Sequence, residues 1–174
     1  MNVRDQLLAQ HSKANTNLIV EWVGSDARRF AEVLQIFLGE DYRLVQRSAW
    51  VVGEIGLKQP ELLAPHTTAL LRALRAPLHP AVQRNGLRLI AESGLRLPEE
   101  EEGQLVDLAF ELLAAPRVPV AIRVHAMQVL ANLCEPYPEL VIELQPYLED
   151  ALKSSSAGMR SRAKRLWAKL YKHL

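Results

Sequence analysis

The chain has 174 residues, of which 49% are hydrophobic and 24% charged, and its formal net charge is +1. This is the composition of an ordinary globular domain and excludes a disordered chain. No apolar run approaches the roughly 20 residues that a transmembrane helix needs, and the N-terminus lacks the apolar core of a signal peptide. With Cys134 as the only cysteine, we expect a cytoplasmic protein without an internal disulfide.

The first 25 residues are predicted to form a helical cap. Their apolar residues predict helices over roughly Val3–His11 and Leu18–Val23. This segment lacks the repeated pattern of the remaining chain. A terminal segment of a helical stack needs an outer face that is compatible with solvent.

A thirteen-residue phrase then occurs four times. It begins at Leu44 (LVQRSAWVVGEIG), Val82 (VQRNGLRLIAESG), Ile122 (IRVHAMQVLANLC) and Met159 (MRSRAKRLWAKLY), so the starts lie 38, 40 and 37 residues apart. Apolar or small residues recur at positions one, five, eight, nine and twelve, which is one face of an α-helix and not the alternation of a strand. A period of this size is typical of stacked helical hairpins.

A second amphipathic helix precedes each phrase, and prolines separate the helices. The predicted ranges are Asp26–Leu38, Glu61–Leu74, Glu99–Ala114 and Glu139–Lys153. We therefore predict one all-α domain, an α–α superhelix with a cap over residues 1–25 and four hairpins over 26–58, 59–97, 98–137 and 138–174. Pro65 would mark the first turn of the second of these helices, and Pro146 is expected to kink the fourth.

Small residues indicate where helices approach one another closely. The fifth position of the phrase is always small: Ser48, Gly86, Ala126 and Ala163. We expect a close contact there and also at Gly53, because an interior glycine weakens a helix by roughly 1 kcal/mol relative to alanine. Gly56 and Gly94 end two of the phrases and are expected at helix C-termini. Trp22 and Trp167 lie on apolar faces and are expected in the core.

The phrase resembles the second helix of HEAT repeats, with AWVVGEIG as the best match, and the resemblance covers roughly Ser25 to Leu174. The chain is also similar to a group of small bacterial HEAT-repeat proteins, through QRSAWVVGEIG, HAMQVLANLC and SAGMRSRAKRL. The resemblance implies a HEAT-like scaffold without known chemistry. HEAT-type folds also include protein-binding adaptors, bilin lyases and a DNA glycosylase, so the fold leaves the function open.

In HEAT-type solenoids the second helices line the concave face, so positions four, seven and eleven of the phrase should form a ladder of side chains there. These residues are Arg47, Trp50 and Glu54; Asn85, Arg88 and Glu92; His125, Gln128 and Asn132; and Arg162, Arg165 and Lys169. Only Trp50 among them is neither polar nor charged. An exposed tryptophan near arginine is typical of a binding hot spot. The alternative is that Trp50 packs on the cap.

No catalytic or metal-binding pattern is present, and we predict no catalytic residue, metal or cofactor. The chain has no GxGxxG, GxxxxGK[ST], HExxH or GxSxG, and no two histidines lie three to five residues apart. The acidic run Glu99–Glu102 is expected to be a solvated helix start, because consecutive carboxylates point in different directions. Cys134 is expected to be a small, partly buried residue.

Glu54 and Glu92 occupy equivalent ladder positions, and paired carboxylates can do acid–base work. We expect neighbouring arginines to neutralise them instead, Arg47 and Arg88 respectively.

The leading hypothesis is a non-enzymatic module that binds a protein or peptide on the ladder. An alternative is binding to the phosphate backbone of a nucleic acid, because Lys153 to Leu174 contains seven basic residues and no acid, which leaves a net charge of −6 on the preceding chain. That basic segment could equally be only a solvated outer face. A glycosylase-like or lyase-like enzyme is the second alternative. Membrane binding is not expected, since the apolar face of the last helix is needed for packing. The sequence leaves the partner and the oligomeric state open.

Overall fold

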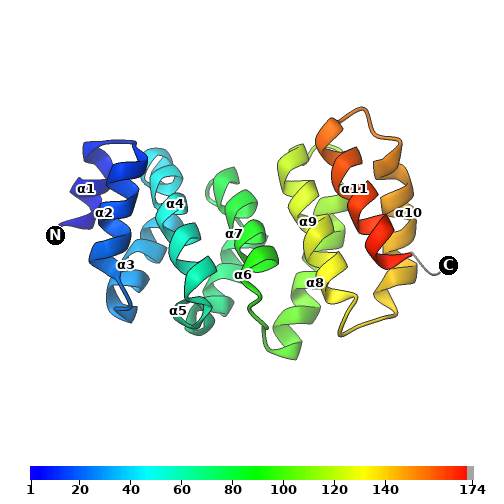
Figure 1. Cartoon of the computed structure of the whole chain (residues 1–174), viewed down its shortest axis with the longest axis horizontal. Helices are drawn as coiled ribbons and strands as arrows, with labels where there is room; N and C mark the ends of the chain where they lie inside the picture. The colour runs from blue at the N-terminus through cyan, green and yellow to red at the C-terminus, as the bar shows by residue number, and fades with distance from the viewer. Residues whose placement is uncertain (172–174) are drawn as a thin grey trace. The chain divides into compact units, whose positions relative to one another are not determined.

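The computed structural model describes residues 1–171, which fold into helices joined by short loops, with no strand among them (Figure 1). The predicted all-α fold is confirmed. Two compact units are present, Met1–Leu97 and Pro98–Leu174. No helix within residues 1–171 is both long enough and apolar enough to cross a bilayer.

In the first unit, a cap of two helices precedes two hairpins. The cap consists of α1 (Val3–Ala9) and α2 (Lys13–Val23), and the first hairpin of α3 (Ala27–Phe37) and α4 (Tyr42–Lys58). The second hairpin consists of α5 (Pro60–Leu63), the 3-10 turn η1 (Ala64–His66), α6 (Thr67–Arg75) and α7 (Pro80–Ser93). Helix α4 is the centre of this unit, because it contacts α1, α2, α3, α5 and α7.

The second unit contains two hairpins. They consist of α8 (Glu99–Ala114) with α9 (Val120–Leu133), and of α10 (Leu140–Leu152) with α11 (Ala157–Leu170). Helix α9 contacts each of the other three. In both units the second helix of every hairpin begins two residues before the repeated phrase.

Several helices begin where a side chain supplies a hydrogen-bond acceptor for the first turn. The Asp41 carboxylate accepts hydrogen bonds from the amides of Arg43 and Leu44 at the start of α4, and the Ser156 hydroxyl accepts one from the Met159 amide at the start of α11. Such side chains satisfy amides that have no partner within the helix. The predicted boundaries of the other first helices agree with α3, α8 and α10 to within one residue.

The predicted single helix over Glu61–Leu74 is wrong. The chain forms α5, then η1, and a new helix begins at Thr67. Pro65 lies inside η1, and proline interrupts a helix because it has no N–H and its ring clashes with the carbonyl four residues earlier. Pro146, in contrast, lies inside α10, which continues through it from Leu140 to Leu152.

The apolar face of the repeated phrase forms the core of each unit. Positions one, five and eight are buried in all four copies. The prediction that Trp22 and Trp167 lie in the core is wrong, because both are only half-buried. Trp167 stacks on Tyr171 with ring centroids 4.5 Å apart, and Trp22 lies beneath the Arg29 guanidinium.

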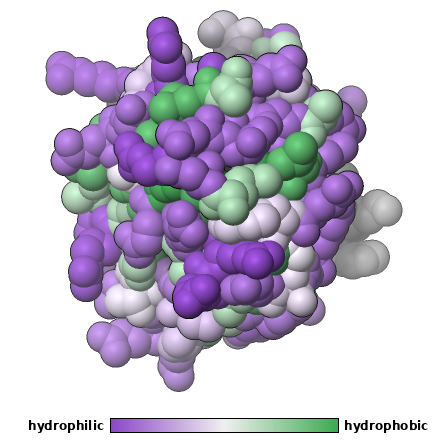
Figure 2. Space-filling model, turned by 90° about the vertical axis from the view of Figure 1, so that its left-hand side faces the viewer, coloured by the Kyte–Doolittle hydropathy of each residue, from purple (hydrophilic) through white to green (hydrophobic). Residues whose placement is uncertain are grey.

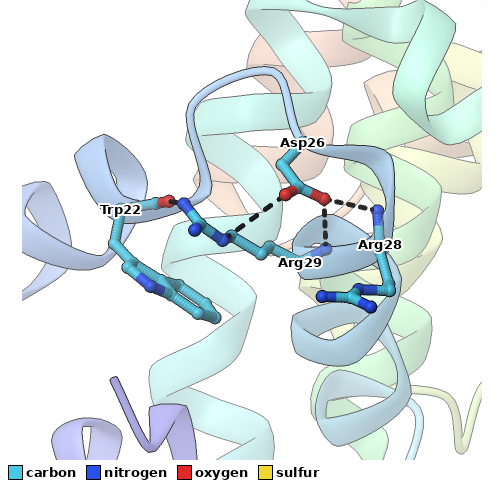
Figure 3. Close-up of polar contacts among 4 residues, drawn as sticks. All are labelled: Trp22, Asp26, Arg28 and Arg29. Atoms are coloured by element: carbon cyan, nitrogen blue, oxygen red, sulfur yellow. Dashed lines mark hydrogen bonds and ion pairs between the residues drawn. The ribbon is translucent and has the colours of Figure 1, made fainter.

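The contact between Trp22 and Arg29 joins the cap to the first hairpin (Figure 3). The guanidinium carbon lies 5.0 Å from the centre of the indole, Nε lies 3.4 Å from Asp26 Oδ2, and Nη1 donates a hydrogen bond of 2.6 Å to the Trp22 carbonyl. Asp26 Oδ1 also accepts hydrogen bonds from the amides of Arg28 and Arg29 at the start of α3. The hydrogen bond from the Arg29 amide is the main cause that lowers the pKa of the Asp26 carboxyl, so the group is charged at neutral pH.

Polar contacts hold the cap to α4 and join its own two helices. Arg47 Nη1 donates a hydrogen bond of 2.7 Å to the Leu7 carbonyl in α1. The buried amide of Asn15 in α2 donates to the carbonyls of Gln6 and Gln10, at 2.8 Å each. The outer face at this end of the molecule is mostly hydrophilic with scattered apolar side chains, as we expect for a cap (Figure 2).

The glycines in the second helices have different roles. A Cβ on Gly86 would lie 2.8 Å from Leu74 Cδ2, so the close contact predicted at the fifth position is confirmed there. Gly94 ends α7 with a φ of 68°, as predicted. Gly56 does not end a helix, because α4 continues to Lys58; a Cβ on it would lie 2.8 Å from Leu89 Cδ1. The close contact predicted at Gly53 is wrong, because a Cβ there would meet no atom within 4 Å.

Alanine substitutions should separate these roles. Gly53→Ala should raise the free energy of unfolding by about 0.5–1 kcal/mol, because alanine favours helix and its methyl group meets nothing. Gly86→Ala should be about 1–3 kcal/mol less stable than Gly53→Ala, because its methyl group would overpack the buried contact with Leu74. Urea denaturation of the two variants and the wild type measures this difference, and equal stabilities of the variants would contradict the assignment.

Candidate functional site

A groove of about 240 Å³ lies between α4 and α7 in the first unit. It is lined by Ala49, Trp50, Gly53, Glu54 and Leu57 from α4 and by Asn85, Arg88 and Leu89 from α7. Four of these eight residues are predicted ladder residues: Trp50, Glu54, Asn85 and Arg88. The structure therefore brings the ladder positions of the first two repeats together around one depression.

The groove has an apolar floor because small and buried residues lie beneath it. Ala49 and Leu89 are buried and Leu57 is half-buried. Gly53 keeps the space above them open, since a side chain at this position would project into a region with no atom within 4 Å of its Cβ. The volume of the groove therefore depends on the absence of a side chain at Gly53.

Trp50 forms an aromatic wall of the groove and is 54% exposed. Its indole meets the ring of His11, from the loop between α1 and α2, in an edge contact with ring centroids 5.7 Å apart and planes at 75°. The cap therefore supports one part of the tryptophan but does not bury it. Of the two interpretations left open by the sequence, exposure with a supporting contact is what the structure shows.

Charged side chains at the rim pair along their own helices. Arg88 Nε lies 2.9 Å from Glu92 Oε2, the pairing that the sequence predicted. The predicted pairing of Arg47 with Glu54 is wrong, because Arg47 donates to the Leu7 carbonyl. Glu54 Oε2 instead lies 3.2 Å from Lys58 Nζ. Such exposed ion pairs stabilise a protein by about 0.3–0.5 kcal/mol each. A charged ligand can therefore replace one partner of a pair at little cost in free energy.

In the second unit, ladder residues of α9 and α11 are hydrogen-bonded to each other. Arg162 Nη1 donates a hydrogen bond of 2.5 Å to Gln128 Oε1, and Gln128 Nε2 donates one of 2.8 Å to Asn132 Oδ1. His125 is half-buried nearby on α9, whereas Arg165 and Lys169 are exposed on α11. Ladder residues of neighbouring repeats thus meet within each unit, and a single continuous ladder over all four repeats stays a prediction.

Helix α11 presents basic side chains to solvent. Arg160, Lys164, Arg165 and Lys169 are exposed, whereas Arg162 is half-buried. Arg160 Nη1 donates a hydrogen bond of 2.6 Å to the Ser154 carbonyl. Lys172 and His173, which also belong to the basic C-terminal segment, lie outside the described residues.

Cys134 caps the C-terminus of α9 and is 5% exposed, more buried than the sequence predicted. Burial raises the pKa of its thiol, which keeps the sulfur protonated at neutral pH and makes it a poor nucleophile. Within residues 1–171, no group of three or more histidine, cysteine or acidic side chains is placed to hold a metal ion.

The acidic run at the start of α8 contains one residue that sequence reasoning missed. Glu102 is 2% exposed, and the Tyr137 hydroxyl donates a hydrogen bond of 2.8 Å to its Oε2, so the predicted solvated start is wrong for this residue. The signal was present in the spacing, because Glu102 lies three residues before Leu105 and seven before Ala109, both of which are buried. The contact ties the loop between α9 and α10 to α8.

Stacked hairpins with a preformed groove on their second helices define a helical-repeat protein of the α-solenoid class. The family model of the HEAT repeat domain matches residues 3–170, and the chain belongs to this family. The match includes α1 and α2, which lie before the Ser25 start of the resemblance noted from the sequence. No curated protein and no solved structure gives a significant match to the chain.

Replacing Tyr137 with phenylalanine should lower the free energy of unfolding by about 1–3 kcal/mol, because a buried carboxylate oxygen of Glu102 loses a hydrogen-bond donor. Tyr42→Phe is the matched control, because Tyr42 is 57% exposed and exposed substitutions stay within about 0.5 kcal/mol. Chemical denaturation of both variants tests this contact. Equal stabilities would show that the hydrogen bond contributes nothing.

Proposed function

We propose that this protein is an interaction module that binds a segment of a partner protein in the groove between α4 and α7. HEAT repeats generally mediate protein interactions, which supports this class of function. The observation that carries the proposal is Trp50, a large aromatic side chain that is 54% exposed beside an open groove with charged residues at its rim. Tryptophan and arginine dominate the energetics of protein interfaces.

The rigidity of the groove also supports binding. Both walls are helices whose opposite faces are buried in the core of the first unit, and Leu89 contributes to core and floor alike. Little conformational entropy is therefore lost from the walls when a ligand enters, and preorganisation of this kind favours affinity.

The size of the groove favours a side chain of a protein over a small-molecule substrate. Pockets for small molecules and cofactors usually measure about 300–1,000 Å³, whereas this groove measures about 240 Å³. Its volume is equivalent to about eight waters at roughly 30 Å³ each in the liquid, which is enough for one large side chain. A groove of this size supports a binding module better than an enzyme.

Blocking the groove should weaken partner binding strongly without unfolding the protein. The partner would be captured from the native cell with the wild type, identified by mass spectrometry, purified, and its Kd measured for each variant. We expect Trp50→Ala with Arg88→Ala to weaken binding by at least about thirtyfold, since a single hot-spot residue contributes about 2 kcal/mol or more and two such contributions need not add. Gly53→Gln should do the same, because its side chain would occupy the groove.

Two controls make this result interpretable. The thermal midpoints of the variants should stay close to that of the wild type. Leu78→Ala should bind normally, because Leu78 is 59% exposed but lies in the loop between α6 and α7 and does not line the groove. Unchanged affinity in the groove variants would refute the proposed site.

A second candidate function is binding to phosphate groups through α11. It is favoured by the exposure of Arg160, Lys164, Arg165 and Lys169 on a helix that contains no acidic residue. The one aromatic residue of α11, Trp167, is half-buried and stacked on Tyr171, so we expect binding that is independent of sequence.

Fluorescence anisotropy with labelled single-stranded RNA and duplex DNA tests this second candidate. If α11 binds phosphates, affinity should fall steeply as salt rises, and Lys164→Ala with Arg165→Ala should reduce the salt slope by about two units for two lost phosphate contacts. A flat titration at low salt would eliminate this function.

A further inference from the structure

One arginine of the chain shows how an aromatic ring and a carboxylate four residues apart can hold a guanidinium. Arg29 stacks over Trp22 at 5.0 Å and pairs with Asp26 at 3.4 Å (Figure 3). The two attractions act together, because the ring face is electron-rich and the carboxylate is charged. This arrangement forms at the surface, where Arg29 and Asp26 keep 43% and 40% of their side chains exposed.

Trp50 and Glu54 have the same separation in the sequence, but Trp22 and Asp26 flank the turn between α2 and α3. Trp50 and Glu54 both lie in α4, where residues four apart are neighbours on one face, and both line the groove. The space beside them is open at Gly53, where an added Cβ would meet no atom within 4 Å. No guanidinium within residues 1–171 stacks on Trp50 as Arg29 does on Trp22; the ring contact of Trp50 is with His11.

We propose that the groove recognises an arginine side chain of the protein partner, held between the indole of Trp50 and the carboxylate of Glu54. This inference rests on the proposed function and names the chemical group that the groove binds. The planar guanidinium of arginine suits the site better than the lysine ammonium, because it can stack on the indole while its edge donates hydrogen bonds to the carboxylate.

The neighbouring charges permit this binding. Glu54 already contacts Lys58, but that pair is exposed and uses only Oε2, so the carboxylate has further capacity to accept hydrogen bonds. Arg88 lies on the opposite wall and would repel an incoming cation. The charge of Arg88 is offset by Glu92, whose Oε2 accepts a hydrogen bond of 2.9 Å from Arg88 Nε. This pairing holds the guanidinium beside the next turn of α7.

A peptide series with the intact protein tests the inference. Short Gly/Ser peptides would carry one central arginine, citrulline, leucine or glutamate, and the indole N–H resonance of Trp50 would be followed by NMR, assigned with Trp50→Phe. We expect saturable shifts with the arginine peptide in the millimolar range. The resonances of Trp22 and Trp167 should not move, because neither residue lines the groove.

The charge requirement is tested by one variant and one matched control. Glu54→Gln should weaken binding of the arginine peptide about tenfold, which corresponds to about 1.4 kcal/mol. Glu32→Gln makes the same charge change at an exposed position of α3 outside the groove and should leave binding unchanged. Citrulline, which has nearly the shape of arginine without its charge, should bind about tenfold more weakly.

Three results would overturn the inference. Equal binding of the leucine or citrulline peptide, with no effect of Glu54→Gln, would make the groove a simple apolar site. Preferential binding of the glutamate peptide would assign recognition to Arg88. No shift of Trp50 with any peptide would exclude recognition of a single side chain. None of these results decides the proposed function. That function is tested by loss of partner binding in Gly53→Gln, which does not depend on which side chain of the partner enters the groove.

Discussion

Close packing between neighbouring helices is the constraint on which the rest of this structure depends. A single amphipathic helix cannot bury its apolar stripe alone, and in a repeat protein each hairpin is stabilised by the next. Here the approach is close because the fifth position of every repeated phrase is small and buried. At Gly86 the available space is filled by Leu74, and at Gly56 by Leu89, so that even one added methyl group would require a neighbour to move.

The same packing creates the groove. Leu89 contacts Gly56 with one part of its side chain and forms the floor of the groove with another, so the close approach of α4 and α7 supports the surface above it. One turn earlier in α4, Gly53 has no neighbour to accommodate. An interior glycine without a packing role reduces helix stability by roughly 1 kcal/mol relative to alanine, and its structural effect here is to keep the groove open beside Trp50.

Some arginines join different elements of the fold, whereas Arg88 pairs within its own helix. Arg47 holds the cap through a backbone carbonyl, Arg29 joins the cap to the first hairpin, and Arg162 joins two repeats through Gln128. These three contribute to packing between elements, because each reaches a group on a neighbouring helix or beyond a turn. Arg88 pairs only within its own helix, at the surface. A side chain with such a weak and local partner is the kind that an incoming ligand can recruit.

The sequence by itself determined the helices and their buried faces. The 3.6-residue spacing of apolar positions and the aspartates and prolines near helix starts are local signals that recur with a period near 38 residues. They placed α3, α8 and α10 to within a residue. Where two local signals competed, as at Pro65, the interruption by proline outweighed the apolar pattern, and one predicted helix became two.

Only the tertiary structure decided what lies opposite each side chain. Gly53 and Gly86 are both interior glycines, yet one faces open space and the other a buried leucine. Glu102 is buried beside Tyr137, which lies 35 residues later, and Trp50 is 54% exposed although the ring of His11 contacts it. Periodicity specifies the direction in which a side chain points from its helix, whereas its burial and its partners depend on segments that are distant in sequence and meet only when the hairpins pack.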